Sequence, residues 1–341
     1  MKIGSIKAIA AAAAFTLLTP AAFAQQKPTY QAAAWEKVLA AAKKEGAVRF
    51  YTAALPATTD RIAAGFRKKY PEIAIETFRA AAGQLMPRVD QERLNNSDGA
   101  DVLISTEVSW YPLRAKENQL VVPIGPAVQQ WPAQHVGEGG RYVIGGYELF
   151  VIPYNKTAVK TAPTSYADLL KPELAGKLGT IESMSQSLAA WYDWLEKTQG
   201  SDYLPKLRAQ NPKLYLSGAP IAQAVASGEI AAGVFATVSA VRPMMNVGAP
   251  VDFAVPNPAF ASIFDVGVLG WSKRPNAALV FMDYVMSMEG QTVWHGTGDS
   301  ASPLNGVPGA MKTGSLVPFN PENYPPDVVK KYNDRWMRIF K

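Results

Sequence analysis

Apolar residues in the first third of the chain recur at helix spacing and at strand spacing in alternation. Over 31–45 the segment QAAAWEKVLAAAKKE places Trp35, Val38 and Leu39 on one helix face, and Gly46 can end this helix in the left-handed conformation. The next segments are the strand AVRFYTA, the helix PATTDRIAAGFRKKY, the strand EIAIETF, the helix GQLMPRVDQERLNN and the strand ADVLIST. Such alternation predicts parallel strands joined by crossover helices, with ligands at the carboxyl ends of the strands.

Two long extended runs bracket the middle of the chain, YVIGGYELFVIPYNKTAV and APVDFAVPNP. Between them a second α/β cycle contains the helix SMSQSLAAWYDWLEK, the strand KLYLSG, the helix APIAQAVASG and one strand in EIAAGVFAT. After them come the strand FDVGVLGWS, a single helix NAALVFMDYVMSMEGQTVW and a final helix YPPDVVKKYNDRWMRIF. This order predicts an α/β protein that leaves one lobe, builds a second and returns. Each lobe is then a mainly parallel sheet flanked by helices.

The first 24 residues have the layout of a secretory signal peptide. Lys2 and Lys7 precede the apolar run AIAAAAAFTLLTP, which is shorter than the roughly 20 residues of a spanning helix, and AFA precedes Gln25. We therefore expect cleavage after Ala24 and a soluble product in a bacterial periplasm. The expected organisation is a signal peptide at 1–24, lobe 1 at 25–148, lobe 2 at 149–250, a return to lobe 1 at 251–300, and a C-terminal segment at 301–341 that packs across the lobes.

Composition removes several classes of function. The 341 residues include no cysteine, which excludes disulfides and thiolate metal sites. The formal charge of +6 is spread without long runs or a basic stripe with interleaved aromatic residues, so we expect no nucleic-acid partner. A charged fraction of 18% and an apolar fraction of 48% are typical of a globular core.

No set of catalytic residues is visible. The segment GTGDSA at 296–301 resembles a dinucleotide-binding fingerprint, but it follows a predicted helix and not a strand. The two histidines, His135 and His295, are far apart and lack acidic residues at metal-ligand spacing. Four acids near predicted strand ends or loops cannot be paired from sequence: Glu107, Asp168, Glu182 and Asp265. We expect a protein that is not an enzyme and holds no metal or cofactor.

Small and hydroxylated residues follow nearly every predicted strand and run into a helix start. Because helix starts present free amide donors and a partial positive charge, these positions suit a polar or anionic ligand, although each hydroxyl can equally be a simple helix cap. They are Tyr51, Thr52, Thr58, Gly83, Gln84, Ser105, Thr106, Ser183, Ser185, Ser187, Ser217, Gly218, Thr237 and Ser239.

The chain resembles the periplasmic substrate-binding proteins of ABC transporters, and among them the extracellular solute-binding proteins related to ferric-iron binders. The resemblance rests on LAAAKKEGAVRFYTA, FRKKYPEIAIE, ADVLIST, VIPYNK, SYADLLKPELAGKLG, QAVASGEIAAGV, GAPVDF and NAALVFMDYVMSMEGQ, which occur in the family's order. It implies a type II periplasmic-binding-protein fold, in which extended hinge segments join two lobes that close on one ligand and deliver it to a permease in the inner membrane. A monomer is expected.

Most of the iron ligands that the related ferric-iron binders carry are missing from this chain. The family's pair of tyrosines falls at Val238 and Ser239, its histidine falls near Leu55, and its glutamate falls at Thr106, one position before Glu107. Neither Val238 nor Ser239 can replace a phenolate. The resemblance therefore implies a ligand other than ferric iron, which stays an alternative only through Glu107.

A cleft rich in hydroxyls, with Arg242 and Arg79 as candidate cations, favours a small organic anion that carries a carboxylate or phosphate. Tyr51, Tyr147, Tyr154 and Trp110 are candidates for apolar walls or for hinge and core packing. The predicted ligand-binding set is Tyr51, Thr52, Gly83, Gln84, Ser105, Thr106, Glu107, Tyr147, Ser183, Ser185, Gln186, Ser187, Thr237, Ser239, Arg242 and Asp265. An organic cation of the polyamine or thiamine kind is the alternative, because Glu107 and Asp265 with aromatic walls suit an amine. A receptor coupled to a sensor kinase and a secreted hydrolase are further alternatives.

Overall fold

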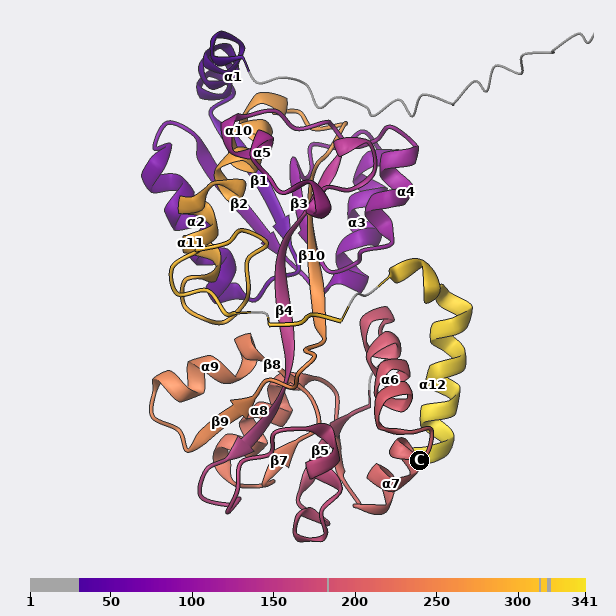
Figure 1. The fold of residues 1–341 in the computed structure, drawn as a ribbon. Helices are drawn as coiled ribbons and strands as arrows, with labels where there is room; N and C mark the ends of the chain where they lie inside the picture. The colour runs from indigo at the N-terminus through magenta and orange to yellow at the C-terminus, as the bar shows by residue number, and fades with distance from the viewer. Residues whose placement is uncertain (1–30, 183, 313, 318–319) are drawn as a thin grey trace, which may run out of the picture.

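The structure, a computed structural model, describes residues 31–182, 184–312, 314–317 and 320–341. The expected signal peptide and its cleavage site lie outside the described residues, as does Ser183. The chain forms two lobes, stacked one above the other in Figure 1 and connected through the long strand β4 (Tyr142–Asn155). The expected α/β fold with two lobes is confirmed.

The strands of both lobes belong to one succession of pairings, in the order β2-β1-β3-β10-β4-β7-β5-β6. The upper lobe contains β1 (Ala47–Thr52), β2 (Ala74–Arg79), β3 (Val102–Ser105), β10 (Ala261–Val268) and the first half of β4. There β1 runs parallel to β2 and β3, and β10 runs antiparallel to β3 and β4. The lower lobe contains β5 (Leu178–Ile181), β6 (Lys213–Tyr215), β7 (Ala232–Gly233), β8 (Ala236–Thr237) and β9 (Val251–Ala254).

Helices cover both lobes. The upper lobe carries α1 (Ala32–Glu45), α2 (Pro56–Lys69), α3 (Ala82–Leu94), α4 (Trp110–Lys116), α5 (Pro126–Gln129), α10 (Pro275–Met286) and α11 (Met288–His295). The lower lobe carries α6 (Gln186–Gln199), α7 (Tyr203–Ala209), α8 (Gly218–Ser227), α9 (Val238–Asn246) and α12 (Pro326–Phe340). Short 3-10 turns are η1 (Ala133–His135), η2 (Glu138–Gly140), η3 (Tyr166–Leu170), η4 (Pro172–Leu174) and η5 (Pro321–Asn323).

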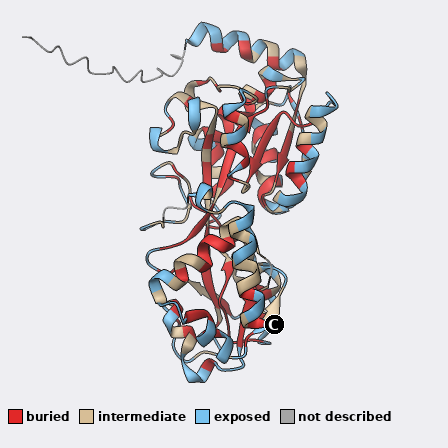
Figure 2. Cartoon of the chain, turned by 90° about the vertical axis from the view of Figure 1, so that its right-hand side faces the viewer, coloured by how far each residue is buried: buried red, intermediate tan, exposed pale blue. Residues whose placement is uncertain are grey.

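Each lobe buries its own apolar core, which appears in Figure 2 as buried strands between exposed helix faces. In the upper lobe the ring of Phe66 meets those of Phe281 and Tyr284 at centroid distances of 5.1 and 5.5 Å. In the lower lobe Phe150 and Phe235 meet edge to face at 4.7 Å. Aromatic contacts of this geometry add to the free energy of area burial, so they stabilise the core of each lobe.

Three predicted elements differ from the structure. The single strand expected in EIAAGVFAT is split into β7 and β8, and α9 begins directly after them. The single helix expected over 276–294 breaks at Ser287, whose hydroxyl accepts a hydrogen bond from the Gly290 amide and starts α11. The strand β9, expected in the return to lobe 1, pairs with residues 152–155 of β4 in the lower lobe.

The C-terminal helix α12 packs against α6 and α7 of the lower lobe (Figure 1). Trp336 is 1% exposed, and its indole N–H donates to the hydroxyl of Tyr192 at 3.2 Å. Arg335 forms an ion pair with Glu196. The segment that leads to this helix begins beside the upper half of β4, where Tyr147 and Ala301 exchange backbone hydrogen bonds of 2.8 and 2.9 Å.

Candidate functional site

The two long strands between the lobes carry a β-bulge at the centre of the molecule. In the β10–β4 pairing Phe264 faces Gly146 and Asp265 faces Ile144, so Gly145 has no partner across the ladder. Its carbonyl instead accepts hydrogen bonds from the side chains of Gln291 and His295, both at 3.2 Å. The paired glycines allow this close approach. A Cβ on Gly146 would lie 2.6 Å from the His295 ring.

Residues on opposite faces of these strands line two different cavities. Phe264 and Glu148 line a cavity between the lobes, whereas Asp265 and Tyr142 line a cavity on the other face. Because neighbouring residues of a strand point to opposite faces, one pair of strands supplies both sites.

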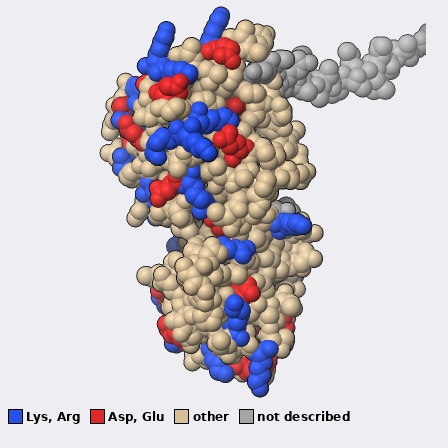
Figure 3. Space-filling view, turned by 90° about the vertical axis from the view of Figure 1, so that its left-hand side faces the viewer, with Lys and Arg blue, Asp and Glu red and all other residues tan. Residues whose placement is uncertain are grey.

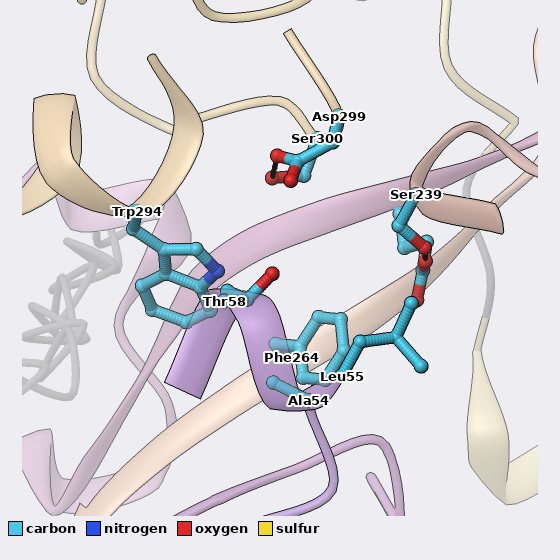
Figure 4. Close-up of a pocket in the computed structure, with 9 residues that line it drawn as sticks. Ala54, Leu55, Thr58, Ser239, Phe264, Trp294, Asp299 and Ser300 are labelled. Carbon is cyan, nitrogen blue, oxygen red and sulfur yellow. Dashed lines mark hydrogen bonds between the residues drawn. The ribbon is translucent and has the colours of Figure 1, made fainter. Parts of the chain in front are cut away.

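The first cavity, which we call the inter-lobe cavity, receives residues from both lobes (Figure 4). Leu55 and Thr58 come from the start of α2 in the upper lobe, and Ser239 comes from the first turn of α9 in the lower lobe. Its volume is about 10 Å³, which is about the room of one water molecule. The full lining is Ala54, Leu55, Thr58, Glu148, Ser239, Phe264, Trp294, Asp299 and Ser300.

Glu148 lies on the long strand β4 and contacts α9 of the lower lobe through Ser239. Its Oε1 accepts a hydrogen bond from the Ser239 hydroxyl, which lies 3.0 Å from the Thr237 hydroxyl. Burial raises the pKa of the Glu148 carboxyl, and the hydrogen bonds from Ser239 and Thr237 act in the opposite direction. The two predicted hydroxyls therefore meet at an acid that the sequence reasoning did not select.

A polar network forms the upper wall of the same cavity. Arg61 donates to Asp299 at 2.6 Å and to the Thr58 hydroxyl at 3.3 Å. Burial lowers the pKa of His295 to about 4, so its ring is neutral at pH 7. The Nε2 faces the Gly145 carbonyl and must carry the hydrogen, which leaves Nδ1 to accept from the Ser300 hydroxyl at 2.7 Å. These bonds hold the wall in one arrangement.

Arg242 does not line the inter-lobe cavity. Its Nε donates to the Gly298 carbonyl at 3.2 Å, its Nη2 lies 3.5 Å from the Met311 sulfur, and its guanidinium stacks 5.0 Å from the Phe253 ring centroid. In this structure Arg242 ties α9 to the segment after α11, and its contact with a solute remains a prediction.

Three predicted ligand-binding residues have structural partners instead. The hydroxyls of Thr52 and Ser105 accept the amide hydrogens of Ala54 and Glu107, and both residues are 0% exposed. Tyr51 points into the upper core, where its hydroxyl donates to Glu92 at 3.1 Å. Turn formation buries Thr52 and Ser105 in this conformation, and the predicted ligand contacts of all three residues are not tested by it.

The other predicted residues lie at helix starts or strand ends. Ser185 is exposed and accepts the Leu188 amide at the start of α6, and its hydroxyl lies 3.2 Å from that of Ser187. The Gln186 side-chain amide donates to the carbonyls of Pro321 and Tyr324 at 2.9 and 3.0 Å. These bonds place the start of α6 beside the segment that leads to α12.

In the upper lobe Gly83 and Gln84 lie exposed in the first turn of α3, and Thr106 and Glu107 are half-buried in the loop after β3. Burial raises the pKa of Glu107. Tyr147 is half-buried, and its hydroxyl lies 3.0 Å from Nδ1 of His135. The ligand contacts of these residues remain predictions.

Sequence reasoning missed Glu148, Asp299 and Ser300 as parts of one site. Glu148 is the one acidic residue in the apolar run YVIGGYELFVIPYN, and a charge in a buried extended segment was the available signal. Asp299 and Ser300 belong to GTGDSA, a segment considered only as a nucleotide motif. Asp299 and Ser300 come close to Glu148 only because of the position of α11 and the β-bulge, which local sequence patterns do not reveal.

Among the residues that the structure describes, no group of three or more His, Asp or Glu side chains is arranged to hold a metal ion. In the same part of the chain, no helix is both long and apolar enough to cross a membrane. On the face drawn in Figure 3, basic and acidic side chains are interspersed over both lobes.

Two α/β lobes connected by long strands are the fold of periplasmic binding proteins. The chain belongs to the family of bacterial extracellular solute-binding proteins, whose family model matches residues 47–298. Members of this family bind solutes and are not enzymes, which confirms the expectation of a non-catalytic protein. The expected resemblance is confirmed as well.

Several solved structures share this fold. The substrate-binding protein of an ABC transporter from Agrobacterium tumefaciens has a TM-score of 0.75 and 17% identity, over 86% of this chain and 94% of that one. Iron-bound HitA from Pseudomonas aeruginosa has a TM-score of 0.69 and 19% identity, over 86% and 99%. AfuA from Actinobacillus pleuropneumoniae, with fructose-6-phosphate bound, has a TM-score of 0.62 and 20% identity, over 87% and 97%.

A curated relative, an uncharacterized protein from Haemophilus influenzae, is 22% identical over 319 residues, which covers 87% of this chain and 86% of the relative. The solved structures share the fold with this chain, but HitA holds iron and AfuA holds fructose-6-phosphate.

Proposed function

We propose that the protein is the periplasmic solute receptor of an ABC importer, exported by cleavage after Ala24. It captures a small organic anion with a carboxylate or phosphate group between its lobes and delivers it to a membrane permease. The observation that carries the proposal is the contact between the start of α6 and Pro321, because Pro321 lines a cavity of about 220 Å³ together with Val108 and Asp265 of the upper lobe. A solute that touches both lobes stabilises the closed state only through such bridging contacts.

The inter-lobe cavity is far smaller than the roughly 300 Å³ that a small-molecule site needs. We therefore assign the solute to the space between the start of α6 and the strand-end loops of the upper lobe. Gln186 supports this location, because it bonds to Pro321, and Pro321 lines a cavity together with Val108 of the loop after β3. The start of α6 thus faces the upper lobe.

The anion is assigned to the start of α6. This helix has 14 residues, and a helix N-terminus offers free amides and a partial positive charge. The exposed hydroxyl of Ser185 and the neighbouring hydroxyl of Ser187 add donors at the same place. Fructose-6-phosphate bound to AfuA is an example of a phosphorylated solute in a protein of this fold.

An organic cation is the second candidate. Among the described residues Glu107, Glu148 and Asp265 form no ion pair with lysine or arginine, and all three carboxyls are partly or fully removed from water. An amine would compensate such charges. Ferric iron keeps only Glu107 of its expected ligands.

The test is a thermal-shift and calorimetry screen of organic acids, phosphate esters, amines and ferric salts. A ligand at 100 times its Kd stabilises the folded state by about 2.7 kcal/mol, so a true solute raises the Tm by several degrees. An anion, recovered unchanged, is the expected hit. A hit confined to amines or ferric salts, or chemical conversion of the hit, would overturn the proposal.

The location is tested with Ser187→Asp, which adds a negative charge while Ser185 keeps its cap. Because an acid is favourable at a helix start, the fold should remain stable. Binding of the anion should weaken more than tenfold. Ser201→Asp, an exposed position at the other end of α6, is the matched control and should leave the Kd unchanged.

A further inference from the structure

A second cavity lies on the opposite face of the hinge strands from the inter-lobe cavity. It has a volume of about 220 Å³, and we call it the Asp265 cavity. Its walls come from the loop after β3, from η1, from β4 and β10, and from the segment before α12. The lining residues that matter below are Val108, His135, Tyr142, Ile263, Asp265 and Pro321.

Asp265 is a buried acid, and burial raises the pKa of its carboxyl well above the ordinary value as long as no positive charge lies beside it. Its side chain is 3% exposed, and Oδ1 has no hydrogen-bond partner among the described residues. No described lysine or arginine forms an ion pair with it. The bulge beside Phe264 sets the direction of the Asp265 side chain. It places Asp265 opposite Ile144, and Asp265 lines the same cavity as Ile263. A buried acceptor left unpaired is costly, so such a group in a native fold calls for a donor.

The groups around Asp265 suit a cation better than a second anion. Tyr142 and His135 both line the cavity, and Nδ1 of His135 lies 3.0 Å from the Tyr147 hydroxyl. Burial lowers the pKa of His135, so this ring brings no positive charge at neutral pH. Burial raises the pKa of Tyr147 to about 12 and of Tyr142 to about 12, and Asp265 adds to both shifts when it is ionised. Neutral aromatic walls around a carboxylate are the chemistry that binds an ammonium group.

The cavity also adjoins the place assigned to the anion. Pro321 lines it, and the Pro321 carbonyl accepts the side-chain amide of Gln186 in the first turn of α6. A helix start that favours negative charge and a carboxylate that favours positive charge therefore lie on two sides of Pro321.

We propose that the Asp265 cavity receives a protonated amine of the solute, with the Asp265 carboxylate as its counter-ion and the rings of Tyr142 and His135 as its walls. The solute is then an amino-bearing organic anion, a zwitterion. This inference rests on the proposed function and narrows its ligand class.

The experiment compares pairs of compounds that share an anionic half and differ in the amine. The pairs are glucosamine 6-phosphate with glucose 6-phosphate, phosphoethanolamine with ethyl phosphate, and 4-aminobutyrate with butyrate. Calorimetry on the full mature protein should find at least one pair in which the amine raises the affinity by tenfold or more. In Asp265→Asn the same pair should differ by less than threefold, because only the amine-bearing member loses affinity.

Asp60→Asn, an exposed acid on α2, is the control and should keep the wild-type ratio. Ile263→Phe is a second variant, which fills the cavity without changing the carboxylate and should also remove the preference. It keeps the test decisive if Asp265→Asn fails to fold.

The outcomes separate the two proposals. If anions bind but their amine-bearing partners bind no better, or if Asp265→Asn keeps the preference, the inference is wrong and the proposed function stands. If no anion binds at all, the proposed function fails and the inference fails with it.

Discussion

His295 offers a quantitative test of the buried wall between the lobes. It is 0% exposed, its ring stacks on Trp294 at a centroid distance of 4.7 Å, and burial lowers its pKa from 6.5 to about 4. Because the unfolded chain binds a proton near pH 6.5 and the folded protein does not, acid favours unfolding. Its contribution to stability is complete above pH 6.5 and is lost as the pH falls toward 4, by about 3 kcal/mol at pH 4.

The perturbation is His295→Gln, whose side-chain amide can still donate to the Gly145 carbonyl. The assay is urea unfolding at pH 7, 6, 5 and 4 for the variant and the wild type. The variant is expected to be less stable at pH 7, since it loses the stacked ring, but the difference should shrink by about 3 kcal/mol by pH 4. His135→Gln, at a half-buried position where burial also lowers the pKa, is the comparison and should show a smaller change of the difference with pH. Parallel pH profiles for wild type and His295→Gln would refute the assignment of a buried neutral ring.

Two further predictions concern packing. Gly146→Ala should lower the free energy of unfolding by about 1 to 3 kcal/mol, because the new Cβ meets the His295 ring at 2.6 Å, whereas Gly83→Ala meets nothing within 4 Å and should be neutral. Equal denaturation midpoints for the two variants would contradict the close packing at the bulge. Trp336→Ala should cost about 3 to 5 kcal/mol, since it removes a buried ring that ties α12 to the lower lobe, and Met337→Ala, at 38% exposure, should cost far less. An unfolding transition of the Trp336 variant that matches the wild type would show that α12 does not stabilise this lobe.

The secondary structure could be predicted well where it rests on local pattern. The helix over 31–45 ends at Gly46, whose φ of 71° is the left-handed conformation that the sequence indicates. The run YVIGGYELFVIPYN forms the 14-residue strand β4 as expected. The break at Ser287 was missed because apolar residues continue across it, while the cap itself depends on one serine hydroxyl.

The site was predicted less well, because a hydroxyl at a strand end has two uses that sequence does not separate. Thr52 and Ser105 accept the amide two residues on, which is a local turn, whereas Ser239 reaches Glu148 on a strand 91 positions away. The partners of Ser239 and Arg242 come from tertiary packing. Residues such as Glu148 become candidates only when the bulge and the two faces of β4 are known.

The central claim, that the protein is a receptor for a small organic anion, is tested most directly by native mass spectrometry of protein purified from the periplasm. The expected spectrum contains the chain without its first 24 residues, in complex with one small molecule that carries a phosphate or carboxylate and is released with its mass unchanged. A complex with iron alone, or a chain that neither carries an organic molecule nor gains one from the panel of anions, would contradict it.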